Sequence, residues 1–336
     1  MDPAFGDRKR IVSVQKELLH PPFNCGNGQD GLHFTRGIPF LDAPRYSLTS
    51  GVYPMRNTTR LFSRTMLLVA LLLAAPVSAL ASVQVQVNGN TATAAIELPG
   101  NLDADLTLSF DSASNLSASS LGIQAQVVSP LDNSILSRLP GINVTSITSA
   151  FPVLITIEPP AGGNLQFTNT YRIELHTHAL QYAPGIRVRL FKAPIGGNFH
   201  DITESVEPGS IRARGRGGAF SQFLFVLDTR ATSQIAQAKL DALNDIIDTG
   251  ATLLPPTTLA QLRGATNRIQ QAIQGNDTTQ ALDSLDALQA QALSLAGTAL
   301  PNLWIAGGSV DNVAGRMLSE IATLRFSLQY LRDYGN

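Results

Sequence analysis

Hydrophobic and polar positions alternate through most of residues 82–228. Val83, Val85 and Val87 alternate with glutamines, and Asn88-Gly89 then supplies residues that tolerate the positive φ of a hairpin turn. Similar runs, separated by turn-forming residues, lie at 92–98, 106–110, 123–128, 142–147, 153–157, 171–177, 186–190 and 220–227. This pattern predicts antiparallel sheets packed face to face as an Ig-like β-sandwich, although a closed barrel would show the same alternation.

The hydrophobic period becomes helical after residue 228. Apolar residues recur at three- and four-residue spacings in four segments, at 235–247, 259–273, 282–293 and 313–331. Thr258 and Gln261 have capping-box spacing, Gly275 is a C-terminal capping residue, and Asp277 with Gln280 repeats the start signal. Four amphipathic helices joined by short loops predict a small α-helical bundle.

We therefore predict an α+β chain of two domains, with an antiparallel β-sandwich at 82–228 and a helical bundle at 229–336. Trp304 lies in the Gly/Pro-rich link before the last helix. Because a large indole ring is usually buried, we expect Trp304 to plug the end of the bundle. The alternative is that it forms an exposed platform for a ligand.

An apolar segment ahead of the first strand has the features of an export signal. Three arginines follow Met55, an apolar run occupies 66–75, and Ala79 and Ala81 stand where signal peptidase requires small residues. The run has about ten residues, roughly half of what a bilayer core requires. We predict a signal peptide at 55–81, a periplasmic or secreted protein of a Gram-negative bacterium, and no permanent membrane anchor.

Residues 1–54 do not fit ahead of such a signal. They carry mixed charges, several prolines and the only cysteine, Cys25, without a sustained apolar period. We expect a non-native or disordered N-terminal extension. The alternative is a cytoplasmic extension ahead of an uncleaved anchor.

Composition and charge narrow the classes of function. The 336 residues include 24 basic and 25 acidic side chains, and residues 82–336 carry 15 basic and 20 acidic ones. This mildly acidic balance gives no electrostatic case for nucleic acid. A single cysteine excludes a disulfide scaffold and a cysteine-rich zinc protein.

Glu174, His176 and His178 are the candidate metal ligands. They alternate along a predicted strand and so share one face, and two imidazoles with a carboxylate can bind zinc. A metal-dependent hydrolase is therefore the alternative function. The opposite positions are the apolar ones, however, which favours a solvated face of the sheet.

Arg212, Arg214 and Arg216 are candidate contacts for an anion or a glycan. They precede a glycine pair in a predicted hairpin, and exposed arginines also protect a sheet edge from aggregation. Glu204 and Glu207 lie in a predicted turn, where solvated loop acids are a better interpretation than a glycosidase pair.

No common catalytic or nucleotide-binding motif occurs in residues 82–336. We therefore predict no catalytic residue and no cofactor, and we predict an exported noncatalytic binding or structural protein of the bacterial envelope with an unknown ligand. An envelope protein or a glycan is the expected partner, and homo-oligomerisation is left open. The loops at 161–169 and 196–201 are the expected binding surfaces, because recognition residues concentrate in loops on a rigid scaffold.

Several sequence segments of the chain resemble those of an uncharacterised family of exported proteobacterial proteins. These are LTLSF at 106–110, FPVLITIEPP at 151–160, DITESV at 201–206 and RARGRGGAFSQFLFVLDTR at 212–230. The resemblance spans most of residues 82–336 and implies a domain of unknown function with a β-sandwich-like region followed by helices. It transfers no functional residue.

Overall fold

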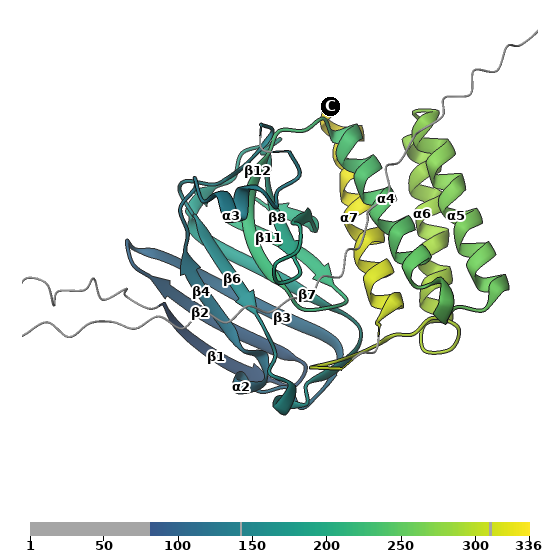
Figure 1. Cartoon of the computed structure of the whole chain (residues 1–336). Helices are drawn as coiled ribbons and strands as arrows, with labels where there is room; N and C mark the ends of the chain where they lie inside the picture. Colours follow the sequence, from purple (N-terminus) through teal and green to yellow (C-terminus); the bar gives the residue numbers. More distant parts are fainter. Residues whose placement is uncertain (1–80, 142, 309–310) are drawn as a thin grey trace, which may run out of the picture. The chain divides into compact units, whose positions relative to one another are not determined.

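The structure is a computed structural model that describes residues 81–141, 143–308 and 311–336. The predicted extension at 1–54 lies outside the described residues, as does the predicted signal peptide up to residue 80. The described part has a mixed α+β fold in which two antiparallel sheets precede most of the helices along the chain (Figure 1). This confirms the α+β class, whereas the Ig-like form of the sheets stays a prediction.

The first sheet has the strand order β1-β2-β3-β7-β11-β10, and β13 pairs with β7 as a seventh strand. The predicted opening hairpin is confirmed, because Val85 pairs with Ala94 and Gly89 has a φ of 57°. The strands are β1 (Ser82–Asn88), β2 (Thr91–Leu98), β3 (Leu102–Ser114), β7 (Gln166–Gln181), β10 (Thr203–Glu207), β11 (Ser210–Gly217) and β13 (Leu303–Ile305).

The second sheet has the strand order β4-β6-β12-β8-β9, and β5 pairs with β12. Its strands are β4 (Ile123–Val127), β5 (Thr145–Ile147), β6 (Val153–Ile157), β8 (Val188–Ala193), β9 (His200–Asp201) and β12 (Gln222–Asp228). Both faces of β12 are apolar, since Phe223 and Phe225 belong to one core cluster and Leu224 and Val226 to another. The short helix α3 (Asn133–Leu136) contributes Ile135 to the second of these clusters.

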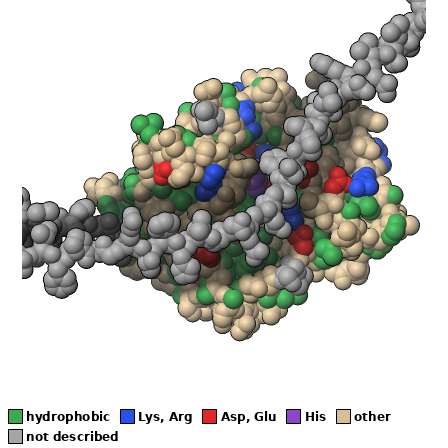
Figure 2. Space-filling model, viewed as in Figure 1, with side chains coloured by type: hydrophobic (Ala, Val, Ile, Leu, Met, Phe, Trp, Pro, Cys, Tyr) green, Lys and Arg blue, Asp and Glu red, His purple; other side chains and the backbone are tan. Residues whose placement is uncertain are grey.

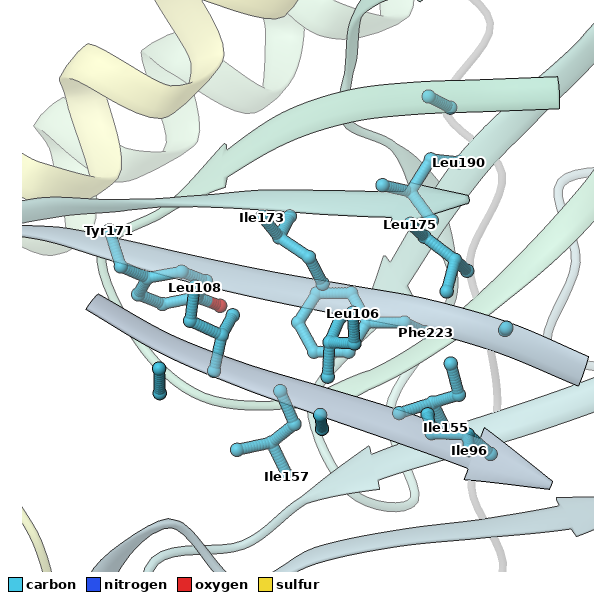
Figure 3. Close-up of a cluster of buried hydrophobic side chains, with 14 of the residues drawn as sticks. Ile96, Leu106, Leu108, Ile155, Ile157, Tyr171, Ile173, Leu175, Leu190 and Phe223 are labelled. Atoms are coloured by element: carbon cyan, nitrogen blue, oxygen red, sulfur yellow. The ribbon is translucent and has the colours of Figure 1, made fainter. Parts of the chain in front are cut away.

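The two sheets bury one hydrophobic core between them. Figure 3 shows this cluster with side chains from both sheets, among them Ile96, Leu106 and Ile173 from the first and Ile155, Leu190 and Phe223 from the second. The alternation along each strand places these residues on the inner face. The sheet part therefore follows the period-two pattern of the sequence.

Two predictions about strands are wrong. The segment with Glu204 and Glu207 forms strand β10 rather than a turn, and it pairs with β11. Its sequence TESVE shows no apolar alternation that would mark it as a strand. Ion pairs with arginines of β11 take the place of apolar contacts on one of its faces. Strand β13 also forms, in the Gly/Pro-rich link before the last helix, where the sequence pattern predicts no strand.

The four predicted helices are confirmed as α4 (Thr232–Thr249), α5 (Pro256–Gln274), α6 (Thr278–Leu295) and α7 (Val313–Tyr334), and they share one core. Asp277 caps α6 as predicted, since its carboxylate accepts from the Gln280 amide at 2.9 Å. The predicted capping box at Thr258 is wrong, because α5 begins earlier with Pro256 at its first turn and Thr258 is buried inside it. No helix among the described residues is both long enough and apolar enough to cross a membrane.

Helix α7 packs against β7, β10 and β11, and it also contacts α4 and α6 (Figure 1). Thr323 Oγ1 donates to the carbonyl of Thr203 at 3.0 Å, and Asn312 Nδ2 donates to the carbonyls of Asn169 at 2.7 Å and Gly218 at 3.0 Å. The described sheets and helices belong to one compact unit. The division into two domains at residue 228 stays a prediction.

Candidate functional site

A cavity of about 550 Å³ lies where the two sheets meet helices α4 and α7. Strands β8 and β11, the segment from Pro194 to Ile202 and the region around Trp304 complete its wall. Figure 2 shows histidine, Lys or Arg, and Asp or Glu side chains gathered on this face, in the hollow between the sheets and the helices. The cavity combines an aromatic wall with charged side chains.

The aromatic wall contains Trp304, Phe220 and Phe199. Strand β13 pairs with β7 and brings the Trp304 ring onto Phe167, with ring centroids 5.1 Å apart in a stacked arrangement. Phe220 lies edge-on to Trp304 and stacks on the buried Tyr171 at 4.7 Å. The prediction that Trp304 plugs the helical bundle is therefore wrong, because its aromatic contacts are with residues of the sheet part.

Lys192 and His200 form the polar part of the wall on the sheet side. They are direct cross-strand partners between β8 and β9, so they share one face. Alternation also places Lys192 on the same side of β8 as Leu190, a residue of the core between the sheets. Lys192 is 9% exposed, and its Nζ has no hydrogen-bond or ion-pair partner among the described residues.

Glu320 completes this polar cluster from helix α7. Its Oε1 lies 3.4 Å from His200 Nε2, while its Oε2 is buried and has no hydrogen-bond partner within the part of the chain that the structure describes. Burial raises the pKa of Glu320 to about 7, although the positive charges of Lys239 and Lys192 oppose the shift. Burial and the nearby Lys192 lower the pKa of His200, so its imidazole is neutral at pH 7.

Two arginines that line the cavity have acidic partners. Arg216 Nε donates to Glu204 Oε1 at 2.5 Å, and Arg316 Nη1 donates to Asp311 Oδ2 at 2.9 Å. Lys192 differs from both because no carboxylate lies within ion-pair distance of its amine among the described residues. The amine is therefore the cationic group of the wall that is left for a ligand.

Replacing Glu320 with Gln should stabilise the protein above pH 7 by about 3 kcal/mol, the value of a raised pKa of this size. Between its ordinary pKa of 4.5 and about 7, only the folded state retains the proton. Stability contributed by this group is thus present below pH 4.5 and is lost as the pH rises towards 7.

Urea unfolding at a series of pH values measures this effect. Glu320→Gln should match the unsubstituted protein near pH 4 and exceed it above pH 7. Glu97→Gln, at an exposed position of β2, is the control. Equal stability of the Glu320→Gln protein and the unsubstituted one at pH 8 would contradict the prediction.

The predicted metal ligands lie together on the outer face of β7, away from this cavity. Glu174 accepts hydrogen bonds from Arg212 and Arg214, each at 2.6 Å, and His176 Nε2 lies 2.7 Å from Ser210 Oγ. In the ranges that the structure describes, no three His, Cys, Asp or Glu side chains are placed to hold a metal ion. The geometry therefore gives no support to a site made of Glu174, His176 and His178.

The predicted anion contacts Arg212, Arg214 and Arg216 lie on β11 and pair with acids of the neighbouring strands. Arg212 and Arg214 contact Glu174 of β7, and Arg214 also contacts Glu207 of β10. The arginine side chains thus balance charges within the first sheet. Their contact with an external anion or glycan stays a prediction.

Comparison with known proteins places the chain in a family. A model described as a family of unknown function, DUF6689, matches residues 67–332. The chain belongs to the DUF6689 family. The comparison with curated proteins gives no match.

In this DUF6689 chain, sequence reasoning missed Lys192 and Glu320. Lys192 occupies an inward position after Val188 and Leu190, and Glu320 stands within the apolar helix α7. A charged residue at a buried position of an otherwise apolar pattern is a signal that could have marked each of them. Their convergence depends on how α7 packs on the sheets, which no local pattern gives.

Proposed function

We propose that the chain is an exported, noncatalytic binding protein of a proteobacterial envelope and that it binds a small molecule in the cavity between the sheets and the helices. The observation that carries the proposal is a 550 Å³ cavity with an aromatic wall that is also lined by Lys192 and Glu320, whose amine and Oε2 have no hydrogen-bond partner among the described residues. Small-molecule sites commonly have such a volume, with mostly apolar walls and a few polar groups that fix orientation.

The predicted loop at 196–201 supports this assignment of the site. Asn198, Phe199 and His200 from that loop line the cavity, together with Trp304 and Lys192. Aromatic faces favour a ligand with an apolar or aromatic body, and a buried amine favours a polar group at one end of it. An Ig-like arrangement of the two sheets belongs to the same proposal and is supported by their shared core.

Export is supported by the basic and apolar pattern of residues 55–81. Fractionation of bacteria that produce the chain from Met55 tests it. We expect a periplasmic or secreted product that begins at Ser82, and we expect Leu68→Arg to keep the product inside the cell because a charge interrupts the apolar run. A product that retains Met55 in the cytosol would overturn the export proposal.

Filling the cavity should weaken ligand binding. Ala242 of α4 lines the cavity and is half-buried, so Ala242→Phe adds a ring there without removing a polar group. The probe is 1-anilinonaphthalene-8-sulfonate, whose aromatic rings and sulfonate match the aromatic wall and the amine. We expect about tenfold weaker binding, which corresponds to about 1.4 kcal/mol.

Trp304 is the only tryptophan of the chain and lines the cavity, so energy transfer from it to the probe reports occupancy. Ala238→Phe is the matched control, because Ala238 is exposed one turn earlier on α4 and does not line the cavity. Equal loss of binding in both variants, or none in either, would overturn the cavity as the binding site. Native mass spectrometry of the chain incubated with envelope extract then identifies natural ligands.

A further inference from the structure

The two lysines in the described part of the chain have opposite surroundings. The chain has four lysines, at positions 9, 16, 192 and 239, and both described ones are buried. The Lys239 amine lies 2.7 Å from an Asp201 carboxylate oxygen and donates to hydroxyls of Thr323 and Ser327. Lys192 has no such partner and reaches the wall of the cavity.

The surroundings of Lys192 disfavour its ammonium form. Burial lowers the pKa of Lys192 to about 8, and Glu320 opposes the shift while Arg316 adds to it. The titratable groups that face this cluster are Glu320 and Arg316 of α7, His200 and Asp201 of β9, and Lys239 of α4. About a tenth of the amine is thus neutral near pH 7, and a neutral amine is a nucleophile.

A proton donor lies in the same cluster. Glu320 is buried, its Oε2 has no hydrogen-bond partner in the described ranges, and its raised pKa of about 7 leaves the carboxylic acid populated at neutral pH. An acid with a pKa near the working pH can both give and accept a proton. The cavity therefore holds a nucleophilic amine, a carboxylic acid and an aromatic wall.

We propose that Lys192 binds small aldehydes or ketones with an aromatic or apolar body as a reversible imine, with Glu320 as the proton donor and the counter-ion of the bound state. The proposal rests on the proposed function, because it uses the same cavity, and it gives that cavity a ligand class. The two unpartnered groups of the cluster, one amine and one carboxyl oxygen, then both have a role.

The atoms of this step balance. The neutral Lys192 nitrogen adds to the carbonyl carbon, and one amine proton moves to the carbonyl oxygen to give a carbinolamine. The hydroxyl of that intermediate leaves as water with the proton of Glu320. The products are a protonated imine, water and the Glu320 carboxylate, which faces the positive charge that has formed. Addition of water reverses the sequence and releases the ligand without an oxidant or reductant.

Reductive trapping of the full chain tests the proposal. Benzaldehyde is the probe, cyanoborohydride reduces any imine to a stable amine, and peptide mapping measures the modification at each of the four lysines. We expect Lys192 to react at least about tenfold faster than Lys239, because the Lys239 amine is held by Asp201, Thr323 and Ser327 and does not line the cavity. The rate at Lys192 should have a bell-shaped pH profile with its maximum between about pH 7 and 8, because the reaction needs both the neutral amine and the protonated Glu320.

Four variants give the trapping experiment its controls. Lys192→Arg should abolish the fast modification and keep the positive charge. Glu320→Gln should slow the modification at Lys192 about tenfold and change its pH profile, because an amide donates no proton. Ala242→Phe should slow the reaction, and Ala238→Phe should leave it unchanged.

Two outcomes separate this proposal from the one on which it rests. If Lys192 reacts no faster than Lys239, while Ala242→Phe still weakens the naphthalene sulfonate, the cavity binds ligands without an imine and the present inference is wrong. If Ala242→Phe affects neither the sulfonate nor the trapping, both proposals are wrong.

Discussion

Replacing Gly315 with Ala should destabilise the protein by about 3 kcal/mol or more, since a new methyl group would meet backbone atoms that cannot move aside. Gly315 lies in the first turn of α7. A Cβ at this position would stand 1.9 Å from the backbone carbonyl oxygen of Asn169 in β7 and 2.5 Å from the side-chain nitrogen Nδ2 of Asn312. The helix would have to withdraw from the sheet.

The same close approach involves hydrogen bonds that the methyl group would break. Asn312 caps α7 by accepting from the Gly315 amide at 2.9 Å, and its Nδ2 donates to the carbonyls of Asn169 and Gly218. Displacing α7 would leave these buried polar groups without partners, at about 1–3 kcal/mol each. The expected loss therefore has a steric and a polar cause.

Gly264 offers a matched control on another helix. It lies inside α5, where the nearest atom to an added Cβ is the end of the Arg268 side chain at 3.9 Å. Gly264→Ala should stabilise the protein by up to about 1 kcal/mol, because alanine is the better helix former. Urea unfolding of the two variants should thus give shifts of opposite sign. A Gly315→Ala protein as stable as the unsubstituted one would contradict the packing of α7 described here.

The sequence predicts the elements of this fold better than their contacts. The helices follow from the three- and four-residue spacing of leucines and isoleucines, and the opening hairpin follows from the alternating valines with Asn88-Gly89. Both signals involve residues that are close together in the sequence, and the local backbone geometry determines whether such a helix or hairpin forms. Strand β10 fails the same test because Glu204 and Glu207 find arginine partners on β11 instead of apolar neighbours.

The candidate site depends on contacts that are distant in the sequence. Trp304 reaches the sheet part because β13 pairs with β7, and Glu320 meets His200 because α7 returns to the sheet edge. Neither pairing has a local pattern. The predicted metal and anion residues share the outer face of β7 and β11, as alternation requires, but their charges satisfy one another there. Alternation predicts the face on which a side chain lies without predicting its partner.

The buried ion pair between Lys239 and Asp201 shows how such a distant contact holds the helices on the sheets. Their charged atoms lie 2.7 Å apart, in the geometry of an ion pair rather than of a well-aligned hydrogen bond. Burial raises the pKa of Asp201, but the positive charges of Lys239 and Arg189 and the polar contacts with Lys239 and Thr203 outweigh this effect, so the pKa is lowered overall. Asp201 therefore stays ionised inside the protein.

Replacing Lys239 with Met should destabilise the protein by about 3–5 kcal/mol, because the Asp201 carboxylate would stay buried without its cation. Lys192→Met is the matched control and should be neutral or stabilising, since it removes a buried amine that has no hydrogen-bond or ion-pair partner among the residues that the structure describes. The double variant Lys239→Met with Asp201→Asn should recover most of the loss. The side-chain amide oxygen introduced at position 201 can still accept from the Thr203 amide, as Asp201 Oδ1 does at 2.8 Å.

The pH dependence of Lys239→Met follows from the lowered pKa of Asp201. In the unsubstituted protein this group contributes stability above its ordinary pKa of 3.8, and the contribution is lost as the pH falls through the lower folded-state value. Without Lys239, burial raises the pKa, and protonation at low pH removes the uncompensated charge. The destabilisation measured by urea unfolding should thus be largest near pH 7 and shrink towards pH 4. A loss of equal size at both pH values would show that Lys239 acts through its packing and its bonds to Thr323 and Ser327 rather than through the charge of Asp201.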